Sequence, residues 1–219
     1  MVMKSSQDPG VEVSRILGMA LGELVAEAGS SVRPPLHARS WNLPDGGLDA
    51  LFGYGLPAPI SYTYMSIEAV YQDSPVPAYA DETGEYYLLG KIGAVLLGAR
   101  GGDGAVFAIP EVREVIPALR DKYPAGIENS LANSSIEALV ELGWRWSLLS
   151  VVLAAERGRA LVAEDAAWKM ARAAGRPHYP GDSSKGYAAL CARVGEAFAV
   201  IDPVSVDADD RLWAQLLER

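Results

Sequence analysis

The chain has 219 residues, half of them hydrophobic, so it can bury a packed core and is not a disordered protein. Its 28 acidic and 19 basic residues give a net charge of −9, which disfavours binding to nucleic-acid phosphates and favours a basic partner, although solubility alone also explains it. The single cysteine, Cys191, excludes an internal disulfide, as is usual in a reducing compartment.

The beginning of the chain shows no pattern of a targeting signal. Residues 1–9 hold one lysine and no apolar core, so no signal peptide is expected. The longest apolar stretches, 92–99 and 148–155, fall far below the ~20 residues that cross a membrane. We therefore expect a cytoplasmic protein without membrane contact.

The first element is a predicted helix over residues 9–28. Asp8 can cap it, a proline follows at the first helical position, and apolar residues recur at helical spacing until Gly29 ends it. Residues 30–35 contain two prolines and are expected to form a loop. Residues 48–52 are expected to form one short helical turn.

The region 58–118 predicts an antiparallel sheet. Aromatic and β-branched residues alternate along short runs, and turn residues separate these runs. The connections are too short for parallel crossovers, so neighbouring strands are expected to pair antiparallel. Strands are predicted at 61–67, 85–93 with a bend at Gly90, 94–99 and 105–109, with turns at 81–84 and 100–104, and a last short strand or helical turn at 112–119.

The region 134–219 predicts helices. Ser134 and Glu137 have the spacing of a capping box, at the start of a helix expected to run to residue 156 or 157. Residues 144–155 are apolar nearly all round, which predicts deep burial, and Gly158 is expected to interrupt the helix. A further helix is predicted at 159–174, ending at Gly175. A loop at 176–182 is expected to precede another helix, which carries Cys191 on its apolar stripe, and a last helix is predicted after Asp207.

This order of elements predicts the fold class. Strands that are segregated from helices along the chain are typical of an α+β fold rather than an α/β fold. We expect a single domain over residues 1–219, in which an antiparallel β-meander of about five to six strands packs against helices and the C-terminal half is helical.

The sequence shows no nucleophile or metal site of a known pattern. His37 and His178 lie in separate predicted loops without a further ligand at metal-binding spacing, so we interpret both as surface residues. Cys191 lies on an apolar helical stripe, where burial disfavours the reactive thiolate. The Ser-Ser-Lys run at 183–185 stands at a predicted helix start, where serines are usually caps.

Glycine-rich and acidic stretches are likewise explained by structure. Residues 98–104 are rich in glycine, but they join two predicted strands, whereas a dinucleotide-binding loop runs from a strand into a helix. Adjacent carboxylates such as Asp81 and Glu82 point away from each other and do not form an acid–base pair. We therefore predict no catalytic, cofactor-binding or metal-binding residue, and a protein that acts by binding another macromolecule.

Four short motifs follow one another in the middle and C-terminal parts of the chain. They are Gly55-Leu56-Pro57, Thr83-Gly84-Glu85, Asn133-Ser134-Ser135-Ile136-Glu137-Ala138-Leu139, and Ile201-Asp202-Pro203 with a Trp213-containing helix after it. In this order they resemble the SUKH superfamily of bacterial immunity proteins, and its fourth subfamily in particular. The resemblance spans about residues 41–219, and the chain departs from the family pattern in its N-terminal helix and at 148–175, which looks like an insertion.

The resemblance implies an α+β protein that catalyses nothing, needs no cofactor and works in the cytoplasm. It implies a function, which is to bind and neutralise a polymorphic toxin domain of the nuclease or nucleic-acid deaminase type. A basic toxin domain would be attracted by the net charge of −9. The motifs do not locate the binding surface, so we hypothesise that acidic and aromatic residues of the sheet and its hairpin loops contact the toxin: Asp73, Asp81, Glu82, Glu85, Tyr86 and Asp103.

Two other interpretations stay open from the sequence. The chain could be an enzyme for a small substrate, with a site that only the fold assembles, or a regulatory or scaffold protein of the same fold. A deep pocket with converging polar groups would favour the enzyme. The sequence does not indicate the oligomeric state.

Overall fold

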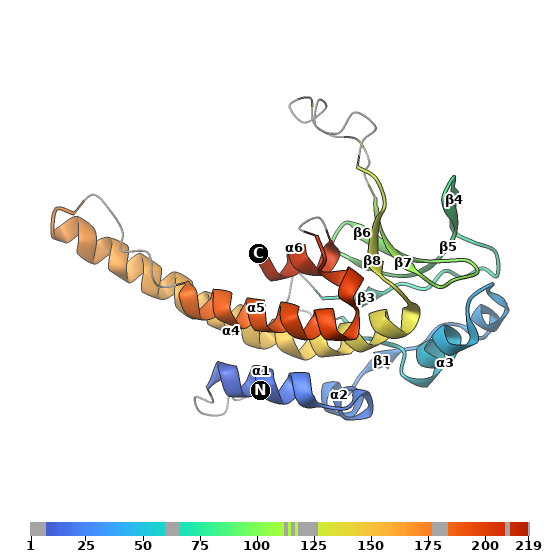
Figure 1. The fold of residues 1–219 in the computed structure, drawn as a ribbon, viewed down its shortest axis with the longest axis horizontal. Helices are drawn as coiled ribbons and strands as arrows, with labels where there is room; N and C mark the ends of the chain where they lie inside the picture. Colours follow the sequence, from blue (N-terminus) through green and yellow to red (C-terminus); the bar gives the residue numbers. More distant parts are fainter. Residues whose placement is uncertain are drawn as a thin grey trace.

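The computed structural model describes residues 8–59, 66–111, 114, 117, 127–176, 184–208 and 211–218. A six-stranded antiparallel sheet lies at one end of the molecule, and the long helix α4 (Ile136–Ala173) runs from it along the length of the molecule (Figure 1). The remaining helices lie against α4 or at the edge of the sheet. Separate helices and antiparallel strands, with a helical C-terminal half, confirm the predicted α+β fold.

The N-terminal segment forms two helices, so the prediction of one helix over 9–28 was wrong. Helix α1 (Pro9–Gly18) begins at the predicted Asp8 cap, and α2 (Leu21–Ala28) ends at Gly29, which has a positive φ of 80°. Between them the backbone is extended at Met19 and Ala20. The break is stabilised from outside, because the Arg145 guanidinium of α4 donates hydrogen bonds to the carbonyls of residues 16, 17 and 19 at 2.8–3.0 Å.

The predicted loop at 30–35 contains a short strand, which corrects the sequence prediction. Strand β1 (Ser31–Val32) pairs antiparallel with β2 (Leu56–Pro57). Gly55 precedes β2 with a φ of 69°, and a Cβ atom there would lie 2.5 Å from the carbonyl oxygen of Val32. Between these strands lie a 3₁₀ helix (η1, Leu36–Ser40) and α3 (Asp45–Gly53), which confirms and lengthens the helical turn predicted at 48–52.

The main sheet confirms the predicted antiparallel meander. Its strands are β3 (Glu68–Ala69), β4 (Tyr79–Asp81), β5 (Gly84–Ile92), β6 (Val95–Arg100), β7 (Val106–Pro110) and β8 (Ser130–Asn133). They follow the order β3-β5-β6-β7-β8, with β4 also paired to β5. The predicted bend is present, because the β5–β6 register shifts between Leu88 and Gly90. Residues 61–65 and almost all of 112–119, where further elements were predicted, lie outside the described residues.

Helix α4 is continuous, so the predicted interruption at Gly158 was wrong. It spans 38 residues, and a Cβ atom at Gly158 would meet nothing within 4 Å. A glycine inside a helix costs only about 1 kcal/mol relative to alanine, which the helix formers around it offset. The helix ends as predicted at Gly175, whose N–H donates to the carbonyl of Arg172 while the Arg176 N–H donates to that of Ala171.

The start of α4 also differs from the prediction by one residue. Ser135, not Ser134, is the cap, and its hydroxyl accepts a hydrogen bond from the Ala138 N–H at 3.2 Å. Ser134 instead donates its N–H to the Asp202 carboxylate at 2.9 Å. The Ser134 N–H, which the Glu137 side chain would bind in a capping box, is thus bound by the carboxylate of Asp202.

The last elements are α5 (Lys185–Ile201), a 3₁₀ turn (η3, Pro203–Ser205) and α6 (Leu212–Glu218). Both helices were predicted, while the loop at 176–182 lies almost wholly outside the described residues. The stripe with Cys191 on α5 is buried, as expected, and so are the apolar residues of α6. The Trp213 ring of α6 packs edge-on against Phe198 and Trp146 at 5.3 and 6.1 Å between ring centroids.

Three residues of the sequence motifs meet in one buried polar network. Asn133 donates to the Asp202 carboxylate at 2.9 Å and accepts from the Trp213 indole N–H at 3.1 Å. Asp202 and Trp213 are about as buried as the residues of the central core, at 1% and 0% exposure. These motif residues therefore stabilise the junction of sheet and helices rather than form an exposed site.

Helix α4 is long and apolar enough, by length and composition, to cross a membrane. Charged and polar residues interrupt its apolar stretches, so no continuous apolar run of that length marks the helix in the sequence. However, 67% of the apolar window is buried inside the protein. This is the environment of a core helix, whose apolar surface is already covered by protein.

Candidate functional site

The sheet gathers four of the predicted site residues at one end. Asp81, Glu82 and Glu85 lie around the turn between β4 and β5, and Asp103 lies in the turn between β6 and β7. The register pairs Tyr86 of β5 with the end of β6, and the Gly101 N–H donates to the Glu85 carbonyl at 2.7 Å, so the two turns are neighbours. We call these four residues the acidic sheet end.

Asp81 organises the first of these turns. Its carboxylate accepts hydrogen bonds from the Thr83 N–H at 2.8 Å, the Thr83 hydroxyl at 2.6 Å and the Asn129 amide at 2.8 Å. The hydrogen bonds from Thr83 lower the pKa of Asp81 below its ordinary value, so the group is charged at neutral pH. Asp81 thus adds negative charge and fixes the shape of the turn.

The second turn carries a charge that is partly neutralised. Asp103 forms an ion pair with Arg100 at 2.5 Å, which lowers the pKa of the Asp103 carboxyl. The Arg100 guanidinium in turn lies over the Phe107 ring, 5.0 Å from its centroid. Glu82 and Glu85 are exposed, and within the described part of the chain neither has an ion-pair partner. The uncompensated charge of the acidic sheet end therefore resides on Asp81, Glu82 and Glu85, whereas that of Asp103 is paired with Arg100.

The other two predicted residues do not belong to this exposed surface. Tyr86 is only 1% exposed, its hydroxyl hydrogen-bonds to the Thr83 hydroxyl at 2.5 Å, and its ring packs against Phe107. Tyr86 thus stabilises the turn of the acidic sheet end through Thr83, and its side chain is too buried to contact a partner. Asp73 is exposed, but it lies in the loop between β3 and β4 and not in either turn. The neighbouring Gln72 side chain accepts a hydrogen bond from the Leu88 N–H at 2.8 Å, which places this loop beside the middle of β5.

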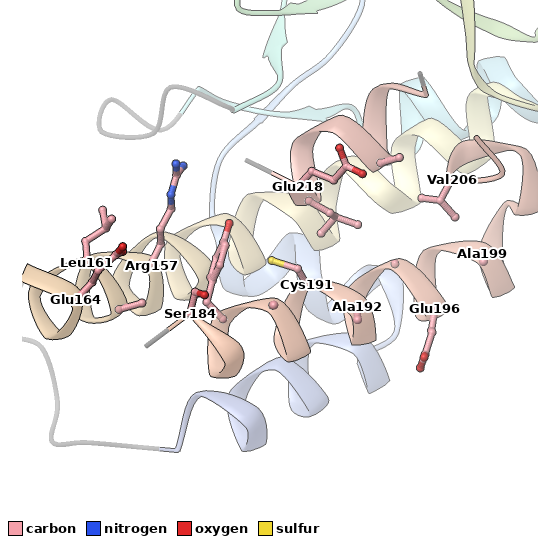
Figure 2. Close-up of a pocket in the computed structure, with 16 residues that line it drawn as sticks. Arg157, Leu161, Glu164, Ser184, Cys191, Ala192, Glu196, Ala199, Val206 and Glu218 are labelled. Carbon is pink, nitrogen blue, oxygen red and sulfur yellow. The ribbon is translucent and has the colours of Figure 1, made fainter. Parts of the chain in front are cut away.

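A groove that was not predicted lies between the helices. It has a volume of about 750 Å³ and is formed by α4, α5 and α6. Figure 2 shows Arg157, Leu161 and Glu164 on the α4 side, Cys191 and Ala192 on α5, and Glu218 at the end of α6. A sign of it was present in the sequence, because Ala188, Ala192, Gly195 and Ala199 repeat at helical spacing beside the apolar stripe of α5.

The groove contains a thiol and a phenol, and both are neutral at neutral pH. Burial raises the pKa of the Cys191 thiol, although the Tyr187 hydroxyl and Arg157 act in the opposite direction. Burial likewise raises the pKa of Tyr187 to about 12, together with its hydrogen bond to Cys191. A protonated thiol is a poor nucleophile and a protonated phenol is not a base, so this pair does not supply acid–base or nucleophilic chemistry at neutral pH.

Metal ligands do not cluster in the structure. Across the residues that the structure describes, no group of three or more His, Cys, Asp or Glu side chains could hold a metal ion. The His37 ring lies 3.4 Å from the Gln72 carbonyl and packs near Trp41, which is a structural environment. His178 lies outside the described residues.

These features define an α+β protein whose distinctive surfaces are an acidic sheet end and an apolar groove. The family model of the SUKH-4 immunity proteins matches residues 16–219, so the chain belongs to the SUKH-4 immunity protein family. The match includes α4 and the N-terminal region from the last turn of α1 onwards. Neither the curated proteins nor the solved structures provide a significant match.

Proposed function

We propose that this protein binds and neutralises a polymorphic toxin domain of the nuclease or nucleic-acid deaminase type. It would act in the cytoplasm, without catalysis and without a cofactor. Membership of the SUKH-4 immunity protein family supports the immunity role. The gathering of Asp81, Glu82, Glu85 and Asp103 at one end of the sheet is the observation that carries the choice of binding surface.

The acidic sheet end suits a toxin that acts on nucleic acids. Such a toxin holds a phosphate backbone with lysine and arginine side chains, so its substrate groove is basic. The exposed Glu82 and Glu85 can take the place of phosphates, and the net charge of −9 would speed encounter. A stable interface buries about 1,600 Å² in total, so it would extend beyond the turns onto neighbouring loops, including the one with Asp73.

The enzyme alternative has less support. The groove is bordered by charged residues, but the thiol and phenol inside it are neutral at neutral pH. The family match favours a protein that acts by binding. A regulatory or scaffold protein would share the same surfaces, and only the partner distinguishes it from an immunity protein.

Co-expression tests the proposal. The toxin domain encoded in the adjacent reading frame would be expressed in a bacterium with and without this protein, and growth and complex formation would be measured. We expect the protein to restore growth and to form a stable complex. If it neither binds that domain nor restores growth, the immunity proposal is wrong.

Charge reversal tests the binding surface. We expect the Glu82→Lys, Glu85→Lys double variant to weaken toxin binding by about tenfold or more, measured by calorimetry, because it places like charges opposite a basic partner. Glu27→Lys is the control, since Glu27 lies on α2, which packs against α4 and belongs to neither proposed surface, and its ion pair with Arg15 is exposed. Equal affinities of all three proteins would remove the acidic sheet end from the proposal.

A further inference from the structure

The groove between α4, α5 and α6 has the shape of a binding site for an elongated ligand. Its lining extends from Ser184, the residue before α5, to Ala199, a distance of fifteen residue steps or about 22 Å at the rise of an α-helix. The volume of about 750 Å³ is therefore spread along a trough rather than collected in a round pocket. A trough of this length accommodates about four turns of a second helix.

The floor of the trough allows a close approach of another backbone. On α5 the lining includes five small residues, Ala188, Cys191, Ala192, Gly195 and Ala199, and one large side chain, that of Tyr187, near the start of the helix. Helices that present small residues pack at the short end of the usual 8–10 Å interaxial range. The apolar side chains of Leu161 on α4 and Leu217 on α6, at the edges of the trough, can then pack against the sides of a docked helix.

The rim of the trough carries an excess of negative charge among the residues that the structure describes. Three of its lining residues are carboxylates, Glu164, Glu196 and Glu218, against a single Arg157. Within the described residues none of the three carboxylates has an ion-pair or hydrogen-bond partner. Elsewhere on the same part of α4, acidic residues do pair within the helix, as Asp165 does with Lys169 and Glu156 with Arg159.

We propose that this trough binds one amphipathic helix of a partner protein, with small or branched apolar residues on its contact face and lysine or arginine on both flanks. The apolar face would cover the floor, and the basic flanks would pair with Glu164, Glu196 and Glu218. This is a second contact surface, remote from the acidic sheet end. The inference rests on the proposed function only for the identity of the partner, the toxin domain.

A second copy of this chain fits the trough less well. The protein carries a net charge of −9, and two troughs that face each other would bring six carboxylates together. A small ligand fits less well too, because the charged groups are distributed along the rim and do not converge on one point. A basic helix satisfies both the length of the trough and the sign of its rim.

A peptide-binding experiment tests this inference with the full chain. The probes are two stapled helical peptides with the same stripe of alanine and leucine, one flanked by lysines and the other by glutamates. We expect the lysine peptide to bind at least about tenfold more tightly in fluorescence anisotropy, with an affinity that falls as salt rises. Equal binding of the two peptides, or binding of neither, would overturn the proposal.

Three variants locate the binding. Ala192→Trp fills the floor and should weaken binding of the lysine peptide by about tenfold or more, whereas Val200→Trp, on an 85% exposed position of the same helix, should leave it unchanged. A triple change of Glu164, Glu196 and Glu218 to glutamine should remove the preference for lysine over glutamate. Circular dichroism would check that each variant is folded. Unchanged binding by Ala192→Trp would assign the peptide to another surface and overturn the proposal.

Sedimentation and neutralisation separate the remaining outcomes. A dimer that Ala192→Trp breaks and Val200→Trp preserves would assign the trough to a second copy, against the proposal. Selective peptide binding without any toxin neutralisation would retain the trough and refute the immunity role. Neutralisation that Ala192→Trp does not affect, together with equal binding of the two peptides, would retain the immunity role and refute the trough.

Discussion

The two halves of α4 have the same backbone conformation but opposite environments. The proximal half, residues 136–153, holds every buried residue of the helix except Ala171. The distal half, residues 154–173, carries large apolar side chains in solvent, with Val162 at 71% and Met170 at 74% exposure. The helix thus leaves the core without ending, and Figure 1 shows its distal half projecting from the body.

The comparison separates what makes a helix from what buries it. The distal half is rich in alanine and has the Glu156–Arg159 and Asp165–Lys169 ion pairs, so it forms a helix from local interactions. The proximal half contains two tryptophans and three valines, which are weaker helix formers, against one of each in the distal half, so it depends more on packing. Most of the exposed apolar side chains of α4 lie in the distal half, whereas the proximal half exposes Val151.

Hydrogen exchange offers the largest expected difference between the halves. We expect amides of the distal half to exchange at least about a thousandfold faster than those of the proximal half, because they can open without disrupting the core. Mass spectrometry of peptides from the two halves measures this. Similar protection in the free protein would show that the distal half belongs to the same cooperative unit.

A pair of tryptophan substitutions compares the halves energetically. Trp144 is fully buried and donates its indole N–H to the Gly55 carbonyl at 3.0 Å, so Trp144→Ala should lower the free energy of unfolding by about 3–5 kcal/mol. Trp168 in the distal half is 39% exposed, and Trp168→Ala should cost less than about 1.5 kcal/mol. Urea denaturation measures both. Equal losses would contradict the division of the helix.

A pair of arginine substitutions follows with a smaller effect. Arg145 is 6% exposed and holds the carbonyls at the α1–α2 break, so Arg145→Met should cost about 2–3 kcal/mol and loosen both N-terminal helices. Arg159→Met in the distal half removes an exposed ion pair and should cost less than about 0.5 kcal/mol. Limited proteolysis before residue 30 would report the loosening. Unchanged proteolysis of Arg145→Met would show that another contact fixes the break.

Much of this fold could be predicted where the signal is local. The strands from Gly84 to Pro110 follow from alternation and turn residues, and α5 and α6 follow from their apolar stripes. The break at Met19 could not be predicted, because its stabilising group, Arg145, stands more than a hundred positions away. The same holds for Ser134, whose partner Asp202 comes from the end of α5.

The candidate sites show the same limit. Pairing of β5 with β6 could be expected from the hairpin, and with it the proximity of Glu85 and Asp103. The burial of Tyr86 could not, since an aromatic residue in a strand suits either face of a sheet. The groove needs three helices that the sequence does not place relative to one another.

The smallest effect tests the continuity of α4 where its two halves meet. Gly158 is exposed and has free space at its Cβ position, so Gly158→Ala should raise the free energy of unfolding by about 0.5–1 kcal/mol through helix propensity. Gly175→Ala is the matched opposite, because a φ of +64° penalises a side chain and should cost about 1 kcal/mol. Urea denaturation should therefore show a higher free energy of unfolding for Gly158→Ala and a lower one for Gly175→Ala. A loss of stability in Gly158→Ala would mean that the helix is broken at this glycine, as its sequence suggests, and that the distal half is a separate helix rather than an extension of the core.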